Sequence, residues 1–121
     1  MSRIAIFASG TGSNAKRIVD FFKHGQESRV EVRLIVTNNP NAGVLKIAEE
    51  EGVEALIINK EFFRSPGFIE LLEQEKIDLI VLAGFLWLIP DSITKSFHNK
   101  IINIHPALLP KYGGKGMYGI K

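Results

Sequence analysis

The sequence contains no cysteine, which excludes disulfide bonds and any metal site built on thiolates, and we expect no metal cofactor. Neither sign of charge is in large excess: the chain has 15 Lys and Arg and 13 Asp and Glu, which gives a net charge of +2. A nucleic-acid-binding chain gathers its basic residues on one face, but bases and acids alternate here, so we expect no nucleic-acid partner.

Long hydrophobic runs are absent as well. The longest run, Leu79 to Ile89, is interrupted by Gly84 and is far shorter than the ~20 residues of a membrane span. The apolar stretch Ile4 to Ala8 is too short for the core of a signal peptide. These absences predict a cytoplasmic protein without membrane contact.

What is present is a regular alternation of apolar strands and amphipathic helices. Helical spacing is clearest in Ala15, Ile18, Val19 and Phe22, and turn residues such as Gly25, Gly52 and Pro66 mark helix ends. The expected strands are Ile4–Ala8, Val32–Val36, Ala55–Ile58, Leu79–Ala83 and Ile101–Ile104. This order predicts an α/β fold, a doubly wound and mostly parallel sheet with helices on both faces. Ligands of such sheets bind at the carboxyl ends of strands.

The first candidate motif, Ser9 to Asn14 (SGTGSN), follows the first expected strand. Glycines let the backbone approach a ligand closely, and free N–H groups at a helix start attract an anion, so the loop predicts a phosphate site. The alternative is a tight turn with Ser13 or Asn14 as the helix N-cap. The loop also fits the dinucleotide fingerprint, but the second strand ends Val36-Thr37-Asn38-Asn39, without the acid that holds the ribose.

The second motif, Ala83 to Pro90, leaves the most apolar strand. An apolar loop with aromatic residues could receive a planar heterocycle. In the alternative interpretation Phe85, Leu88 and Ile89 fill the core, and Trp87 packs on a neighbouring helix.

The third motif, Asn103 to Pro110, follows the fifth strand. Side chains alternate along a strand, so Asn103 and His105 share one face while Ile102 and Ile104 share the other. A histidine beside an amide donor suits acyl transfer, because one moves a proton and the other stabilises an oxyanion. The alternative is a pair of structural polar residues.

In this order and spacing, the three segments make the sequence resemble the phosphoribosylglycinamide formyltransferases. The resemblance covers essentially the whole chain. It implies that residues 1–121 are the N-terminal, nucleotide-binding portion of a single formyltransferase domain. It also implies formyl transfer from 10-formyltetrahydrofolate to the amine of 5-phosphoribosylglycinamide, in purine biosynthesis.

The resemblance also implies roles for individual residues. Gly12, Ser13 and Asn14 would bind the phosphate of the ribonucleotide. Asn103 would stabilise the oxyanion, and His105 would transfer the proton. The folate would lie against five residues, of which Asn103 also has the catalytic role: Leu86, Trp87, Leu88, Ile89 and Asn103.

Two departures from the family pattern stand out. Trp87 occupies a position that often carries a basic residue, and the aspartate that sets the protonation of the histidine would lie beyond Lys121. The chain also ends in a glycine-rich stretch, so we expect the C-terminal strands and helix to be absent and this chain to be inactive alone. We expect small-molecule substrates only and a monomer or homodimer. The alternatives are a methionyl-tRNA formyltransferase, which lacks this phosphate loop, and a non-catalytic or nicotinamide-binding Rossmann domain.

Overall fold

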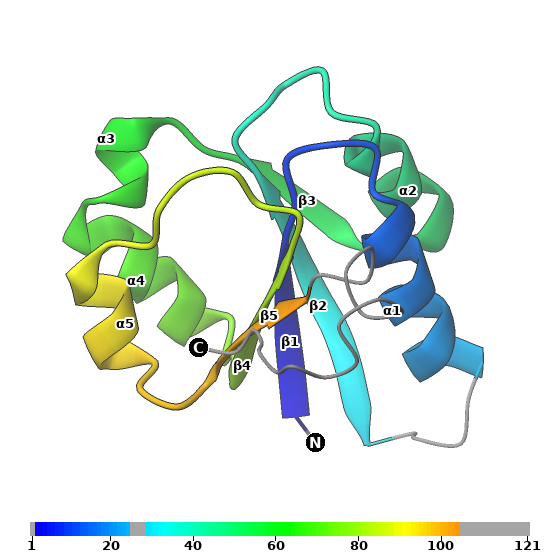
Figure 1. Ribbon diagram of the computed structural model, residues 1–121. Helices are drawn as coiled ribbons and strands as arrows, with labels where there is room; N and C mark the ends of the chain where they lie inside the picture. The colour runs from blue at the N-terminus through cyan, green and yellow to red at the C-terminus, as the bar shows by residue number, and fades with distance from the viewer. Residues whose placement is uncertain (1, 25–28, 105–121) are drawn as a thin grey trace, which may run out of the picture.

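The computed structural model describes residues 2–24 and 29–104 of the chain (Figure 1). Strands and helices alternate along it, as the apolar pattern predicts. In chain order they are β1 Ser2–Phe7, α1 Ser13–His24, β2 Val30–Thr37, α2 Val44–Glu51, β3 Glu54–Ile57, α3 Lys60–Phe63, α4 Pro66–Gln74, β4 Leu79–Ala83, α5 Asp91–Ser96 and β5 Ile101–Ile104.

The strands form one five-stranded sheet in the order β3-β2-β1-β4-β5, and every pairing among the described residues is parallel. The chain first runs outward from β1 through β2 to β3. It then crosses back and continues on the other side of β1 with β4 and β5. The order therefore reverses between β1 and β4, and this is the place where doubly wound sheets bind their ligands.

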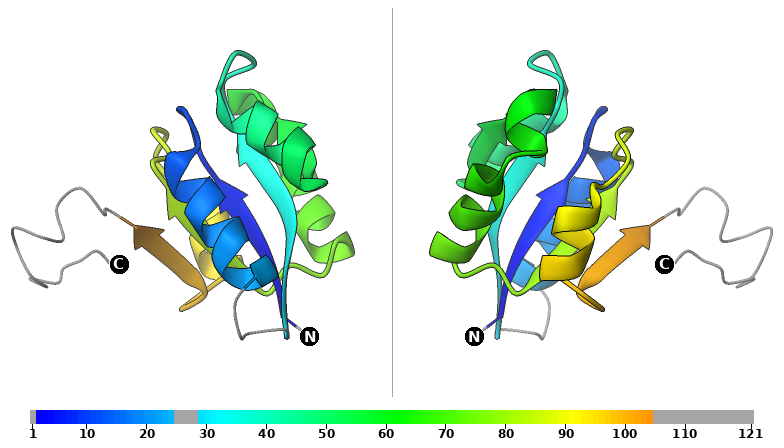
Figure 2. Two further views of the ribbon diagram at one scale, coloured as in Figure 1. Left: turned by 90° about the vertical axis from the view of Figure 1, so that its right-hand side faces the viewer. Right: turned by 90° about the vertical axis from the view of Figure 1, so that its left-hand side faces the viewer.

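Each face of the sheet is covered by its own helices, and each has its own core (Figures 1 and 2). Alternation along β1 divides the side chains: Ile4 and Ile6 point to one side, Ala5 and Phe7 to the other. The first side is covered by α1 and α2, and the second by α3, α4 and α5. The doubly wound arrangement expected from the sequence is confirmed.

Local signals at the helix ends are confirmed at two positions. Gly52 follows α2 in the left-handed conformation, with φ 71°, and its N–H donates to the carbonyls of Ala48 and Glu49. Pro66 is the first residue of α4, where its missing N–H costs nothing. Gly25, the expected end of the first helix, lies outside the described residues.

Two strands end one residue earlier than the sequence predicts. Ala8 and Ile58 lie just outside β1 and β3, yet their N–H groups donate to Val36 and Thr37 at 2.9 Å and so continue the ladder. Helix α3 was missed altogether. It has only four residues, too few for a helical period, and its one local signal is Asn59, whose side chain accepts the Phe62 N–H at 2.8 Å.

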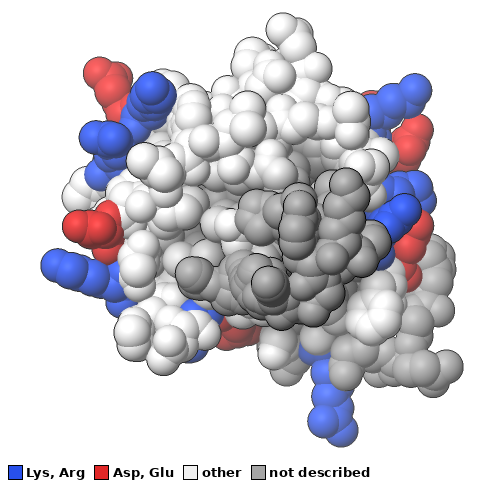
Figure 3. All heavy atoms as spheres, in the orientation of Figure 1, with Lys and Arg blue, Asp and Glu red and all other residues white. Residues whose placement is uncertain are grey.

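The surface carries mixed charge. In Figure 3, Lys and Arg lie beside Asp and Glu at both margins of the face shown, without a continuous basic patch among the residues that are described. Within the same residues, no helix has both the length and the apolar character needed to cross a membrane.

Candidate functional site

The three motifs singled out in the sequence begin at or just after the ends of β1, β4 and β5, which are consecutive in the sheet. Because the strands are parallel, their carboxyl ends meet at one edge, and the β1–α1 and β4–α5 loops lie together there (Figure 1). The fold thus brings residues 9–14, residues 84–90 and the end of β5 to one edge of the sheet, near the switch point, which is the place between β1 and β4 where the strand order reverses.

The β1–α1 loop leads directly into the start of α1. The carbonyl of Gly12 accepts the Lys16 N–H at 2.8 Å, which makes Gly12 the N-cap. The N-cap alternative for Ser13 or Asn14 is therefore wrong, because both are already helical. Among the described residues, the N–H groups of Ser13, Asn14 and Ala15 have no protein partner, as expected in a first helical turn. Such a terminus favours an anion.

Gly12 is required for packing as well as for conformation. Its φ is +87°, and a Cβ at this position would lie 2.7 Å from Val44 Cα and 2.9 Å from Val44 Cβ. Gly43 makes the reciprocal approach, since its Cβ would lie 2.9 Å from the Thr11 carbonyl oxygen. The Val44 N–H also donates to the Gly10 carbonyl at 3.2 Å. The close backbone approach that the sequence assigned to a ligand is thus an approach to the start of α2.

Ser9 joins three loops at this edge. It is 5% exposed, and its hydroxyl donates to Asn38 Oδ1 at 2.6 Å and accepts the Leu86 N–H at 2.9 Å. Its own N–H donates to the Gly84 carbonyl at 3.2 Å. The sequence interpretation gave Ser9 no role, although alternation along β1 could have indicated one. Ser9 follows Phe7 on the face of α3, α4 and α5, where a buried hydroxyl needs partners.

The residues at the end of β2 test whether the chain could bind a dinucleotide, because a dinucleotide site needs an acidic residue there. The residues there are Thr37 and Asn38, and the Asn38 side-chain oxygen accepts the hydrogen bond from Ser9. The Thr37 hydroxyl accepts the Asn39 N–H at 3.2 Å. This end of the strand therefore has amide and hydroxyl groups engaged within the loops, and no carboxylate to bind ribose hydroxyls.

The β4–α5 loop divides its side chains between the core and solvent. Phe85 and Ile89 pack against the core, as the structural alternative predicted, but Leu88 does not: it is 90% exposed and Leu86 is 79% exposed. The turn out of β4 begins at Gly84, whose φ of 78° directs the loop away from the strand. Two large apolar side chains are thus presented to solvent at the ligand-binding edge.

Trp87 packs on α3, as that alternative predicted. Its ring lies 5.7 Å from the Phe63 ring, and the Lys60 ammonium lies 5.7 Å from the Trp87 centroid, within cation–π range. The loop and helix together form a groove of about 220 Å³, lined by Lys60, Phe63, Arg64, Leu86, Trp87 and Leu88. Helix α3, which the sequence did not predict, thus forms one wall beside the expected folate segment.

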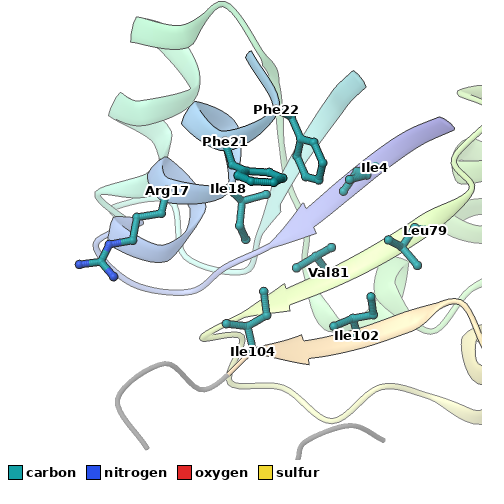
Figure 4. A pocket seen from close by; sticks show the side chains of 9 residues that line it. All are labelled: Ile4, Arg17, Ile18, Phe21, Phe22, Leu79, Val81, Ile102 and Ile104. Carbon is teal, nitrogen blue, oxygen red and sulfur yellow. The ribbon is translucent and has the colours of Figure 1, made fainter. Parts of the chain in front are cut away.

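Asn103 lies near the end of β5, opposite Leu82 of β4, which in turn lies opposite Phe7 of β1. Residues in register across a parallel sheet project to the same face, so Asn103 points to the side of α5. Ile102 and Ile104 point to the other side (Figure 4). The predicted separation of faces is confirmed for these strand residues. His105 lies outside the described residues.

One titratable group near the loop is perturbed. The pKa of Lys16, in the first turn of α1, is raised by its hydrogen bonds to Asp20 and Glu51, with the Asp20 contribution the larger. Its ammonium lies 3.0 Å from Asp20 Oδ1 and 3.2 Å from Glu51 Oε2. The charge of Lys16 is therefore already paired with two carboxylates, while the backbone N–H groups of the helix start favour an anion.

A separate apolar groove of about 310 Å³ lies on the face of the sheet that α1 covers, opposite the face to which Asn103 points (Figure 4). Side chains of α1, including Ile18 and Phe21, form one wall, and apolar side chains of β4 and β5 form the other. Its described lining residues are apolar except for Arg17, so they do not supply the convergent polar groups of a ligand site. In the part of the chain that the structure describes, no cluster of three or more His, Cys, Asp or Glu could hold a metal.

The same sequence pattern and fold occur in known proteins. The sequence profile of a family described as formyl transferase matches residues 2–120. The chain belongs to the formyl transferase family. Its relatives include proteins named phosphoribosylglycinamide formyltransferase. The chloroplastic protein of Arabidopsis thaliana is 38% identical over 98% of this chain and 42% of its own length. The Haemophilus influenzae protein is 32% identical over 98% of this chain and 58% of its own length.

Solved structures of formyl transferases have the same fold. Glycinamide ribonucleotide transformylase 1 from Geobacillus kaustophilus superposes with a TM-score of 0.79 at 37% identity, over 95% of this chain and 63% of the other. Phosphoribosylglycinamide formyltransferase from Anaplasma phagocytophilum gives 0.78 at 32% identity, over 95% and 55%. This chain spans about half of the length of the two named relatives, 42% of one and 58% of the other.

Proposed function

We propose that this formyl transferase chain carries the substrate-binding loops for formyl transfer from 10-formyltetrahydrofolate to the amine of 5-phosphoribosylglycinamide. The observation that carries the proposal is the start of α1. Among the residues that the structure describes, the N–H groups of Ser13, Asn14 and Ala15 have no protein partner, and they follow β1 at the edge where β5, which bears Asn103, also ends. The names of the relatives point to the same reaction.

The phosphate of the ribonucleotide would bind at this helix start. Gly12 provides the N-cap carbonyl and the turn, and the Ser13 and Asn14 side chains would add hydrogen bonds to the phosphate beside those of the N–H groups. The positive end of the helix dipole favours a doubly charged phosphate. With its phosphate held there, the amine end of a small ribonucleotide can extend along the sheet edge toward β5.

The folate would lie against the β4–α5 loop. Leu86 and Leu88 offer exposed apolar surface, and Trp87 fixes the loop on α3. A flat apolar surface with nearby backbone polar groups suits a planar ring system. Leu86, Trp87, Leu88, Ile89 and Asn103 remain the proposed folate residues.

In the chemical step, the amine nitrogen bonds to the formyl carbon and the bond from that carbon to the folate nitrogen breaks. Asn103 would donate its side-chain N–H to the formyl oxygen as negative charge develops there. His105 would accept a proton from the attacking amine and return it to the leaving nitrogen. The amine loses one proton and the folate nitrogen gains one, so the reaction is balanced without metal or redox chemistry being required.

The experiment has a binding arm and a kinetic arm. Titration of 5-phosphoribosylglycinamide into the ¹⁵N-labelled chain should shift the Ser13, Asn14 and Ala15 amide resonances. Asn14→Ala should weaken binding, whereas Asn41→Ala, an exposed asparagine of the neighbouring loop, should leave it unchanged. Unperturbed Ser13 and Asn14 resonances at saturating ribonucleotide would overturn the phosphate assignment.

The kinetic arm uses the protein that carries this chain and follows the formylated product by mass spectrometry. Glycinamide ribonucleotide should be the acceptor, and methionyl-tRNA should not. Formylation of methionyl-tRNA would support the related tRNA enzyme instead. A rise in melting temperature with NAD but not with a folate analogue would favour the dinucleotide alternative. The cytoplasmic location and the monomer or homodimer state remain predictions, to be measured by cell fractionation and light scattering.

A further inference from the structure

Two loops proposed to bind different substrates are joined through a single residue, Ser9. Ser9, at the start of the β1–α1 loop, holds the β4–α5 loop at two points. Its N–H donates to the Gly84 carbonyl at 3.2 Å, and its hydroxyl accepts the Leu86 N–H at 2.9 Å. These bonds fix the separation between the phosphate loop and the expected folate segment at its first turn.

The third bond of Ser9 orients its hydroxyl. The proton is donated to Asn38 Oδ1 at 2.6 Å, so a lone pair is left facing the Leu86 N–H. The side chain is almost fully buried, where replacement partners from solvent are scarce. Ser9 is thus satisfied only while the ends of β1, β2 and β4 keep this arrangement.

The neighbouring contacts make the phosphate loop responsive to an anion. The loop touches α2 through Gly12 and Val44, and within the described part of the chain its N–H groups at the helix start have no protein partner. An anion bound there would order the loop and restrict Ser9. Because Leu86 is hydrogen-bonded to Ser9, its motion would be restricted as well. The β4–α5 loop would then lose less conformational entropy when its own ligand binds.

We propose that Ser9 is a positioning residue that couples the two binding loops, so that an anion at the start of α1 orders the segment around Leu86. This inference rests on the proposed function for the identity of the two ligands, but the link through Ser9 can be tested without either. Coupling of this kind is reciprocal, so folate binding would also strengthen phosphate binding.

The first test is amide hydrogen exchange at Leu86 in the chain without ligand. The Leu86 N–H should be protected in the wild type although its side chain is exposed. Ser9→Ala removes the acceptor and should speed its exchange about tenfold or more. Thr37→Val is the matched control, because it removes another buried hydroxyl at the same edge of the sheet. That hydroxyl accepts the N–H of Asn39 and makes no bond to Leu86. Leu86 exchange should not change in that control.

The second test adds ribose 5-phosphate as the anion. In the wild type it should slow Leu86 exchange about fivefold or more and alter the fluorescence of Trp87, the single tryptophan of the chain. Ser9→Ala should still bind the anion but lose both responses. If Ser9 had only a structural role, Ser9→Ala would lower the stability of the chain, but Leu86 exchange and Trp87 fluorescence would still respond to the anion. Asn38→Ala, which leaves the Ser9 hydroxyl unoriented, should weaken both responses and serves if Ser9→Ala does not fold.

The outcomes separate this inference from the proposed function. Shifts at Ser13 and Asn14 with no response at Leu86 or Trp87 would overturn the coupling and leave the phosphate site standing. No shift at Ser13 or Asn14 would overturn the phosphate site, and with it the anion as the source of coupling. Unchanged Leu86 exchange in Ser9→Ala would overturn the role of Ser9 whatever the ligand does.

Discussion

Replacing Gly12 with alanine tests how the β1–α1 loop is built. Two costs add at this position. A residue with a Cβ loses about 1–2 kcal/mol at a left-handed backbone, and φ here is +87°. The new Cβ would also lie 2.7 Å from Val44 Cα, a backbone atom at the start of α2 that cannot turn away. Overpacking of this kind costs about 1–3 kcal/mol.

Together these costs predict a loss of about 2–5 kcal/mol in the free energy of unfolding, a large share of the ~5–15 kcal/mol of a typical domain. The chain supplies controls that separate them. Gly52 has φ +71° but open space around its Cβ position, so Gly52→Ala should cost only the conformational part, about 1–2 kcal/mol. Gly10 has neither constraint, and Gly10→Ala should be within about 0.5 kcal/mol of wild type.

The assay is urea denaturation of the variants, followed by Trp87 fluorescence and circular dichroism, together with ribonucleotide titration of each folded variant. Gly12→Ala should be the least stable, and its anion affinity should fall because the start of α1 moves. Equal destabilisation by Gly12→Ala and Gly52→Ala would refute the steric argument. Normal stability with lost binding would mean that the glycine faces the ligand rather than α2.

Three further predictions address the chemistry, the missed helix and the paired lysine. In the protein that carries this chain, Asn103→Ala should lower kcat about 10²–10³-fold and His105→Ala the rate about 10²–10⁴-fold. Unstable but fully active variants in kinetics and thermal melts would contradict both roles. Asn59→Ala removes the cap of α3, so it should cost about 0.5–2 kcal/mol in urea and shift the emission of Trp87; an unchanged spectrum would show that α3 does not hold the loop. Lys16 has a raised pKa, so the stability it contributes is full below the ordinary value of 10.5 and is lost as pH rises through the raised value. Lys16→Gln should remove that alkaline loss, and an unchanged pH profile would contradict the pairing.

The parts of the fold that follow from local pattern were predictable. β4 and β5 have the bounds expected from the sequence, Leu79–Ala83 and Ile101–Ile104, because each is a short and mostly apolar run of the length of a strand. Pro66 and Gly52 mark helix ends through backbone chemistry that needs no tertiary context. The ordering of motifs after β1, β4 and β5 followed from the same alternation, and so did their placement at one edge.

The sequence by itself thus determined the α/β class, the strands and the edge at which candidate residues gather. Only the tertiary structure decided which of these residues touch. Ser9 and Leu86 are 77 positions apart, and the Gly12 contact with Val44 joins the β1–α1 loop to the start of α2. Leu88 was assigned to the core in one interpretation, yet it is exposed, because the turn at Gly84 redirects the loop. Periodicity describes which face of an element a side chain occupies. It contains no information about which loops are in contact, because that depends on the packing of the whole sheet and its helices.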